Sequence, residues 1–439
     1  MTAPKASARD VAFDVVRDVF GPDLRGAQAA FDVRARRAGL DARDRAFAAE
    51  LAYGSIKQRR LLDWYLGPYI GERGKPLPPA ILEVLRLGVY QVRFTAAGDH
   101  AAVSETVNLA WRHGHRGTAG LVNAVLRKML ADGPLSPDPA DFENENDYLG
   151  TRFSVPSWIA AQFGRAYDGA RDLALAGVNT APQHALRVNV LRAQPETICA
   201  ELGERGIGAR RSAFVPESLL VDSGTVGDDP AGRWSVQGEA AAMPVDLLAP
   251  RSGETVLELC GGRGNKTVQI AARLGGEGRV VTVELDEKKL RVMREQLERA
   301  DAANVAVVHG DAREAAAEVR ADAVLLDAPC SGIGVIGRHP EARWRKTPQD
   351  GARLAGAQSE LLRAAAARTA PGGRLVYSVC STDAREGREC IDAFLGDEPA
   401  FSRAQLPERY APFERDGDVV VPAGIEGRDG FYIASLLRA

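Results

Sequence analysis

Two cysteines follow apolar stretches that are typical of buried strands, and both could take part in covalent chemistry. Cys330 lies in the run "LLDAPCSG" (325–332) three residues after Asp327, and Cys380 lies in "YSVCS" (377–381). If the two strands are parallel neighbours, their carboxyl ends meet at one edge, and we expect both thiols in one crevice. A lone strand-end cysteine is more often a small buried hydrophobe, but two at adjacent strand ends favour a chemical role. The residues alone do not rank the two thiols.

A thiolate at this edge needs nearby positive charge to be favoured at neutral pH. Three residues could supply that charge: Lys266, Arg338 and His339. A thiol combined with a methyl donor permits methylation at C5 of a pyrimidine, because C5 becomes nucleophilic only after a thiolate has added to C6. Asp327 would suit the role of holding the base at N3 and the amino group.

A glycine-rich turn, "CGGRGNKT" (260–267), precedes these motifs and follows an expected strand at 255–259. One interpretation is a phosphate-binding P-loop, but such a loop has glycine directly before the lysine, and Asn265 stands there. The other interpretation is a loop that binds an adenosyl cofactor, since glycines allow close backbone approach and a helix N-terminus offers free N–H groups.

Two acids favour the adenosyl interpretation. Glu284 ends the next expected strand, 23 residues after Gly261, where a carboxylate can bind ribose hydroxyls. Asp311 follows the third strand and could reach an adenine edge. Together with the loop, these acids predict S-adenosylmethionine as the cofactor.

The other cysteines and the histidines give no sign of a metal centre. The five cysteines form no CxxC pair, and with the six histidines they match no zinc-site spacing, so we expect no metal. Cys199 and Cys390 are expected to be buried hydrophobes, and Cys260 a packing residue of the glycine turn. The stretch "RHPEARWR" (338–345) suits either a solvated loop or a contact to a phosphate or a base.

The elements that must position this chemistry alternate between strand and helix from about residue 250 onwards. The expected strands are 255–259, 279–285, 305–310, 323–328, 374–379 and 431–437, with helices at 287–301 and 352–369 among those between them. This alternation predicts a doubly wound, mostly parallel sheet.

The preceding part of the chain has a different pattern. The first 130 or so residues read as helices, with core faces at 80–94 and 121–130, and a proline-rich acidic stretch follows at 131–150. Residues 1–140 carry a net charge of +5 and the remainder −8, a mild asymmetry that could favour a polyanion. The chain has no apolar run of about 18 residues and no signal peptide, so we expect a soluble, cytosolic protein without membrane contact.

Several motifs resemble, in order and spacing, those of the Sun/NOL-type RNA cytosine-5 methyltransferases. The resemblance is carried by "LELCGGRGNKT", "LLDAPCSGIGVIGRHPEARW" and "YSVCSTDAREGRE", and by "GRDGFYIASLLR" at the end. The early stretches "YGSIKQRRLLDWYL", "HAAVSETVNLA" and "GLVNAVLRKML" resemble the NusB-like domain that is fused to bacterial members. The similarity spans nearly the whole chain.

The resemblance implies a role for each matching residue. Cys380 takes the position of the nucleophile, and Cys330 takes the position linked to release of the methylated base. Asp327 and Lys266 are the other catalytic residues that it implies. The cofactor-binding residues that it implies are Cys260, Gly261, Gly262, Arg263, Gly264, Asn265, Lys266, Glu284, Asp311 and Asp327.

The loop departs from the usual family sequence, which reads Ala-Pro-Gly-Gly-Lys. Arg263 replaces the proline, and Glu284 stands where aspartate is usual. After Cys380, only Glu386 remains of the family's acidic motif. None of these changes removes a reacting group.

The resemblance also implies the domain organisation. We expect an all-α NusB-like RNA-binding domain at 1–132, a linker at 133–150, and a small α+β RNA-binding subdomain at 151–240. A Rossmann-like class I S-adenosylmethionine-dependent methyltransferase domain is expected at 241–439.

The expected activity is methylation of a cytidine at C5 in 16S ribosomal RNA by a cytosolic monomer that uses S-adenosylmethionine. Three alternatives remain: a cytosine-5 methyltransferase acting on tRNA or another RNA, an ATPase using the glycine turn, and a non-catalytic RNA-binding assembly factor.

Overall fold

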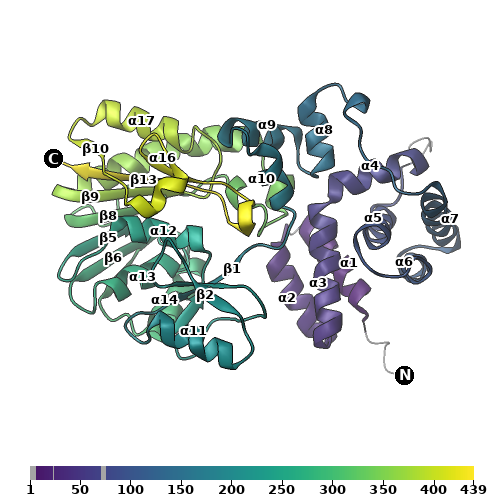
Figure 1. Cartoon of the computed structure of the whole chain (residues 1–439), viewed down its shortest axis with the longest axis horizontal. Helices are drawn as coiled ribbons and strands as arrows, with labels where there is room; N and C mark the ends of the chain where they lie inside the picture. The colour runs from purple at the N-terminus through teal and green to yellow at the C-terminus, as the bar shows by residue number, and fades with distance from the viewer. Residues whose placement is uncertain (1–5, 23, 71–75) are drawn as a thin grey trace. The chain divides into compact units, whose positions relative to one another are not determined.

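The computed structural model describes residues 6–22, 24–70 and 76–439. The chain forms two compact units. The helical unit contains the chain up to Asn179 together with His339–Arg345, and the sheet unit contains Thr180–Arg338 and Lys346–Ala439 (Figure 1). No helix within the described ranges is long and apolar enough to cross a membrane.

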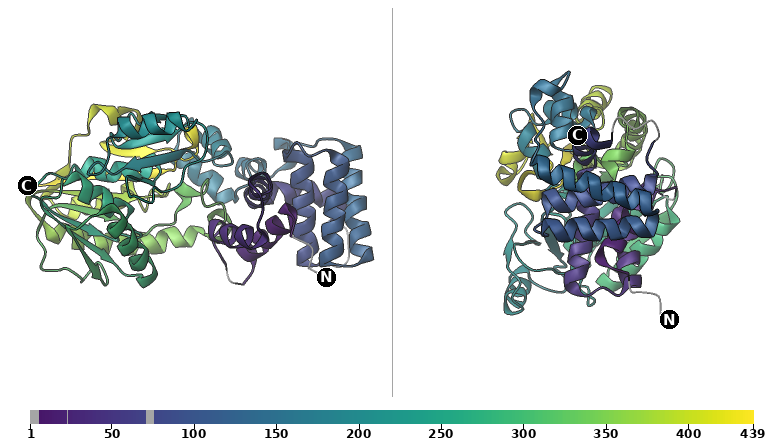
Figure 2. Two further views of the ribbon diagram at one scale, coloured as in Figure 1. Left: turned by 90° about the horizontal axis from the view of Figure 1, so that it is seen from below. Right: turned by 90° about the vertical axis from the view of Figure 1, so that its right-hand side faces the viewer.

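The helical unit confirms the predicted all-α start of the chain. Its helices are α1 (Ala8–Phe20), α2 (Ala27–Ala38), α3 (Ala42–Lys57), α4 (Arg59–Ile70), α5 (Pro79–Phe94), α6 (Asp99–His113), α7 (Arg116–Asp132), α8 (Glu145–Arg152), α9 (Ser157–Ala166), α10 (Arg171–Gly177) and α15 (Ala342–Arg345), with a 3₁₀ turn η1 (Pro139–Asp141). Helices α5, α6 and α7 pack side by side (Figure 2). Residues 151–179, predicted to belong to the small α+β subdomain, lie in this unit.

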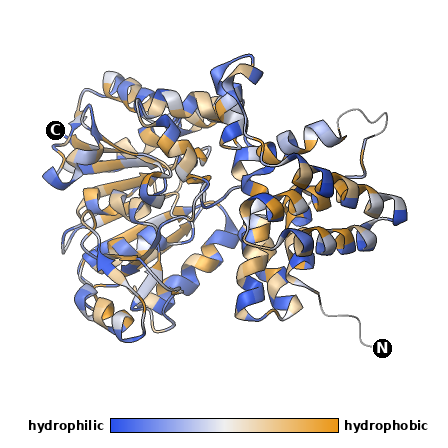
Figure 3. Cartoon of the chain, turned by 45° about the vertical axis from the view of Figure 1, so that its right-hand side comes forward, coloured by the Kyte–Doolittle hydropathy of each residue, from blue (hydrophilic) through white to orange (hydrophobic). Residues whose placement is uncertain are grey.

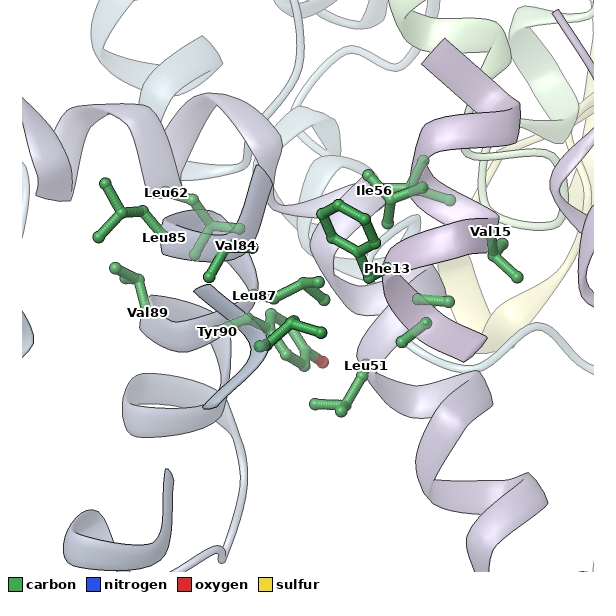
Figure 4. Packing of buried hydrophobic residues seen from close by; sticks show 14 of the residues in the cluster. Phe13, Val15, Leu51, Ile56, Leu62, Val84, Leu85, Leu87, Val89 and Tyr90 are labelled. Carbon is green, nitrogen blue, oxygen red and sulfur yellow. The ribbon is translucent and has the colours of Figure 1, made fainter. Parts of the chain in front are cut away.

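Local sequence explains where these helices begin and how they pack. Ser7 caps α1 with a capping box, and Asp41 accepts a hydrogen bond from the first turn of α3. Phe13, Leu51 and Leu85 are fully buried in one apolar core (Figure 4). The helices accordingly show a hydrophobic and a hydrophilic side (Figure 3).

Most of helix α5 is buried, as its sequence predicts, and the buried charges Glu83 and Arg86 are paired. Arg86 donates to Asp63 (2.7 Å) and to Glu83 (2.6 Å), so its burial leaves no unpaired charge in that network. Gly54 of α3 meets Tyr90 of α5, where a Cβ would lie 2.0 Å from the ring. A side chain at Gly54 would therefore push the two helices apart.

The sheet unit begins with a small antiparallel sheet of order β2-β3-β1-β4. Its elements are β1 (His184–Val188), α11 (Pro195–Glu204), β2 (Ala209–Arg211), β3 (Ser218–Val221) and β4 (Trp234–Val236). Ile198 and Leu202 of α11 pack with Leu186 and Leu219 of the sheet. This arrangement confirms the predicted small α+β region.

The large sheet has the order β11-β12-β13-β9-β8-β5-β6-β7, and β10 pairs with β13. Its strands are β5 (Thr255–Leu259), β6 (Arg279–Glu284), β7 (Val305–His309), β8 (Ala321–Asp327), β9 (Thr369–Val379), β10 (Phe401–Arg403), β11 (Glu414–Arg415), β12 (Asp418–Val421) and β13 (Phe431–Arg438). The helices and 3₁₀ turns between them are α12 (Glu239–Leu248), α13 (Asn265–Arg273), α14 (Glu287–Ala300), η2 (Ile333–Val335), α16 (Pro348–Arg368), α17 (Arg388–Asp397), η3 (Glu408–Phe413) and η4 (Ile425–Gly427).

The five strands β5 to β9 are parallel, and β13 adds to β9 in the antiparallel direction (Figure 1). Both faces of the sheet are covered. Leu257 of β5 belongs to the core formed with α16, whereas Val256 belongs to the core formed with α12 and α13. The doubly wound prediction is thereby confirmed, and the strand order reverses between β5 and β8, where such sheets bind ligands.

Candidate functional site

The centre of the candidate site is an ion pair at the point where the strand order reverses. Lys266, in the first turn of α13, donates from Nζ to Asp327 Oδ2 at 2.6 Å. Asp327 ends β8, and its Oδ1 accepts a hydrogen bond from Ser378 Oγ at 2.7 Å. Burial would lower the pKa of Lys266, but Asp327 outweighs it and raises that pKa above its ordinary value. Lys266 is therefore a fixed cation at the carboxyl edge.

The structure brings together the two cysteines of the sequence motifs. Cys330 Sγ lies 3.2 Å from Cys380 Sγ, and both side chains are partly buried. The hydrogen bond with Cys380, burial and the carboxylate of Glu386 raise the pKa of the Cys330 thiol well above its ordinary value. Cys330 is therefore held as the neutral thiol.

The glycine turn is shaped by positive φ angles. Cys260 has φ of 63°, Gly262 of 61° and Gly264 of 88°. At Gly261 a Cβ would lie 2.2 Å from Thr282 Oγ1 and 2.9 Å from Met293 Cε, so the turn lies directly against its neighbours. These contacts require glycine at Gly261, and the positive φ angles favour glycine at Gly262 and Gly264.

The first turn of α13 is suited to a polar ligand. The first hydrogen bond into the helix runs from Val268 N to Gly264 O, so the preceding N–H groups point out of the helix N-terminus. A Cβ built at Gly262 would have no neighbour closer than 4.0 Å, which leaves space over the turn. Asn265 and the exposed Arg263 border this space in the chain. The turn fits an adenosyl cofactor.

The two strand-end acids lie at the same edge but differ in their present partners. Glu284 ends β6 and accepts hydrogen bonds from the N–H groups of Gly262 (2.8 Å), Leu285 (3.0 Å) and Asp286 (2.9 Å). Asp311 follows β7 and forms a bidentate pair with Arg313, which lowers the pKa of Asp311 to about 2. Glu284 thus braces the glycine turn, while Asp311 is a permanently ionised carboxylate.

The remaining cysteines behave as structural side chains. Burial raises the pKa of the Cys260 thiol to about 12, and the carboxylates of Glu284 and Asp327 act in the same direction. Cys390 is buried. Cys199 donates to Ala209 O at 3.1 Å. These placements agree with the packing roles that the sequence predicts for them.

The sequence reasoning missed Glu258, a fully buried carboxyl one residue before the end of β5. Its Oε2 accepts hydrogen bonds from Thr267 Oγ1 (2.5 Å) and Thr282 Oγ1 (2.8 Å). Oε1 has no hydrogen-bond partner in the part of the chain that the structure describes. Burial raises the pKa of Glu258 to about 7. An acid inside an otherwise apolar strand was the only available signal.

The interpretation of 338–345 as a solvated loop or a nucleic-acid contact is wrong for Arg343. This side chain is 0 % exposed and donates to carbonyls of the helical unit, at Ser154 O (3.2 Å) and Val178 O (3.1 Å). Arg338 is paired with Asp429 at 3.0 Å, and His339 belongs to the helical unit. Of the three cations that the sequence suggested, Lys266 is the one that contacts the site, through its ion pair with Asp327.

No group of three or more His, Cys, Asp or Glu side chains within residues 6–22, 24–70 and 76–439 could hold a metal ion.

Three family descriptions match successive parts of the chain. Residues 6–131 match the NusB family, and residues 155–226 match the ferredoxin-like domain of RsmF/B-like methyltransferases. Residues 245–437 match the family described as 16S rRNA methyltransferase RsmB/F. The matches follow the order of domains that the resemblance implied.

Two curated relatives extend this similarity over most of the chain. The probable ribosomal RNA small subunit methyltransferase B of Bacillus subtilis is 33 % identical over 91 % of this chain and 92 % of its own length. The ribosomal RNA small subunit methyltransferase B of Thermus thermophilus is 36 % identical over 94 % of this chain and 93 % of its own.

Two solved structures have folds similar to that of this chain. The crystal structure of PH0851 matches 99 % of this chain and 99 % of its own, with a TM-score of 0.81 and 26 % identity. The structure of NSun6 from Pyrococcus horikoshii with SFG covers 64 % of this chain and 98 % of its own, with a TM-score of 0.57 and 18 % identity, which shows a shared fold.

Proposed function

Because the chain belongs to the RsmB/F family of 16S rRNA methyltransferases, which use S-adenosylmethionine, we propose that it methylates C5 of a cytidine in 16S ribosomal RNA. The observation that carries the proposal is the pair of thiols, 3.2 Å apart, at the carboxyl edge that also holds Lys266 and Asp327. Methyl transfer to an oxygen, an exocyclic nitrogen or a ring nitrogen needs no thiol. Methylation at C5 does, because this carbon must first be activated through C6.

The proposed reaction begins with Cys380. Its sulfur forms a bond to C6, and the electron pair of the C5–C6 double bond becomes available at C5. Bound S-adenosylmethionine supplies the methyl group that C5 accepts. A water molecule then takes the C5 proton, the electron pair of that C–H bond re-forms the C5–C6 double bond, and the electron pair of the C6–S bond returns to Cys380. Cys330 assists this last step.

The charges around the two sulfurs support this division of roles. Lys266, whose pKa is raised chiefly by Asp327, is the fixed cation of this edge. Cys330 instead lies beside the carboxylate of Glu386, and its thiol has a raised pKa. A proton is therefore kept at Cys330, which suits a thiol that helps to release the base rather than one that attacks it.

We assign Asp327 to the base. Its carboxylate is oriented by Lys266 on one oxygen and by Ser378 on the other, so one lone pair on each oxygen is already engaged. The remaining lone pairs can accept from the amino group of a cytosine. Because a base inside a helix cannot reach the site, the target must be unpaired or flipped out.

Cofactor binding is assigned to the turn from Cys260 to Lys266 and to the acids Glu284 and Asp311. The outward N–H groups of α13 suit the carboxylate of the methionine part, and the strand-end acids suit hydroxyl and amino groups of the adenosine part. We assign RNA contact outside the site to the NusB-like domain and to the subdomain at 151–240, chiefly through phosphates and shape.

Bisulfite sequencing of RNA from cells with and without the gene tests the proposal. We expect one 5-methylcytidine of 16S ribosomal RNA to disappear in the deletion strain and to return with the intact gene, but not with Cys380→Ala. Loss of a tRNA methylation instead would reassign the substrate. Unchanged 5-methylcytidine in all RNAs would refute the activity.

A further inference from the structure

The carboxylate that helps to raise the pKa of Cys330 is itself buried and hydrogen-bonded to the turns of both cysteines. Glu386 is 0 % exposed. Its Oε1 accepts hydrogen bonds from Ser331 N (2.8 Å) and Gln358 Nε2 (3.1 Å). Its Oε2 accepts from Ser331 Oγ (2.5 Å) and from Ser381 Oγ. Four donors on two oxygens satisfy this carboxylate without a cation, an arrangement that needs close agreement of several backbone positions.

The donors are the residues that follow the reactive cysteines. Ser331 comes directly after Cys330, and Ser381 comes directly after Cys380. The two hydroxyl oxygens also lie 3.0 Å from each other. Glu386 therefore joins two turns that are 50 residues apart in the sequence. It binds each turn at the residue that directly follows the cysteine.

Other contacts fix Glu386 itself. Tyr377 Oη donates to the main-chain oxygen of Glu386 at 2.6 Å, from strand β9. Gln358, on α16, donates to Pro329 O at 2.9 Å in addition to Glu386. The carboxylate is thus anchored to the sheet, to α16 and to the turn before Cys330.

We propose that Glu386 is a positioning residue for methyl transfer, whose carboxylate holds the Cys330 and Cys380 turns together and so sets the separation of the two sulfurs. The proposal rests on the function proposed above. Shifts of about 1 Å in a reacting group are enough to slow catalysis greatly, so a clamp on both turns has a direct chemical purpose. Ser331 acts on the releasing thiol, and Ser381 acts on the attacking thiol.

The first test measures the separation of the sulfurs without RNA. In a glutathione redox buffer, oxidised glutathione converts the two thiols to a disulfide and is itself reduced to two molecules of glutathione. The equilibrium constant between the dithiol and the disulfide gives the effective concentration of the Cys330 thiol near the Cys380 thiol. We expect Glu386→Ala to lower it about ten- to hundredfold, the scale of one lost hydrogen bond to a charged group.

Two further variants make this test specific. Glu386→Gln should stay within about threefold of wild type, because the serine hydroxyls can rotate to accept from the amide. Ser359→Ala is the matched control, since Ser359 lies on α16 near Cys390 and bonds Ala355 O. It should leave the equilibrium unchanged. An unchanged equilibrium in Glu386→Ala, with a melting temperature near that of wild type, would overturn the proposal.

The second test uses the intact enzyme with RNA and does not depend on whether Glu386→Ala folds. Ser331→Ala removes the hydroxyl that ties the Cys330 turn to Glu386. The releasing thiol is then no longer held in place, so we expect a covalent enzyme–RNA adduct to accumulate. Ser381→Ala removes the hydroxyl that ties the Cys380 turn to Glu386, so the attacking thiol is no longer held in place. We expect the single-turnover methylation rate to fall about tenfold or more, without accumulation of the adduct. Equal behaviour of both variants and of Ser359→Ala would overturn the proposal.

The two tests separate this proposal from the function on which it rests. If Cys380→Ala methylates RNA normally, the proposed mechanism fails, whatever the thiol equilibrium shows. If Cys380→Ala is inactive but Glu386→Ala leaves the thiol equilibrium unchanged and the two serine variants behave like Ser359→Ala, the mechanism survives and the clamp is refuted.

Discussion

Replacing Glu258 by glutamine should change how the stability of the protein depends on pH. The carboxyl is fully buried in β5, and burial raises its pKa from 4.5 to about 7. Between these values the unfolded chain carries an ionised Glu258, whereas the folded protein keeps the proton. The folded state therefore binds more protons, so the stability of wild type falls as pH rises through this window and stays low above it.

The size of the effect follows from the same values. At about 1.4 kcal/mol for each pH unit, the difference between 4.5 and about 7 corresponds to about 3 kcal/mol. Glutamine keeps the shape of the side chain but carries no ionisable proton. We therefore expect the stability of Glu258→Gln, relative to wild type, to rise by about 3 kcal/mol between pH 4.5 and pH 7.

Urea denaturation of both proteins at several pH values between 4.5 and 8 measures this difference. Any pH-independent effect of the substitution cancels in the comparison. Glu295→Gln, an exposed carboxyl on α14, is the control and should shift stability by less than about 0.5 kcal/mol at every pH. A constant difference between Glu258→Gln and wild type across the range would refute the reasoning about this buried acid.

Three further perturbations test the site and its support. Lys266→Met leaves Asp327 without its cation and should lower the single-turnover methylation rate about a hundredfold or more, and a rate within threefold of wild type would contradict the assignment. Gly261→Ala places a Cβ 2.2 Å from Thr282 Oγ1 and should weaken S-adenosylmethionine binding at least tenfold by calorimetry, whereas Gly396→Ala, which meets no atom within 4 Å, should not. Arg343→Met leaves buried carbonyls unpaired and should destabilise the helical unit by about 2–4 kcal/mol in thermal unfolding, and an unchanged melting temperature would contradict that role.

The parallel sheet could be predicted because each strand carries its own signal. Strands β5, β6 and β8 are mostly apolar and mostly buried, as expected for strands covered on both faces, and a glycine or an acid lies at or just after the end of each. The meeting of the two cysteine motifs could also be predicted, because the carboxyl ends of neighbouring parallel strands lie at the same edge of a sheet. The 3.2 Å contact of the sulfurs is a direct consequence of the pairing of β8 with β9.

Long-range partners explain what the sequence could not predict. Arg343 has the same local appearance as an exposed arginine, and only the carbonyls of Ser154 and Val178, far away in the chain, make it a buried one. Glu258 could be seen as an acid in an apolar strand, but its hydrogen bonds to Thr267 and Thr282 depend on how α13 and β6 pack. Pairings of this kind are set by the fold and leave no local pattern.

The central claim is that Cys380 attacks the base and Cys330 helps to release it, and a denaturing gel tests this most directly. Each single variant is mixed with S-adenosylmethionine and 16S ribosomal RNA labelled at its 5′ end, and bands that migrate as a covalent enzyme–RNA adduct are counted. We predict a strong adduct band for Cys330→Ala and none for Cys380→Ala or for the double variant. A band for Cys380→Ala and none for Cys330→Ala would contradict the account.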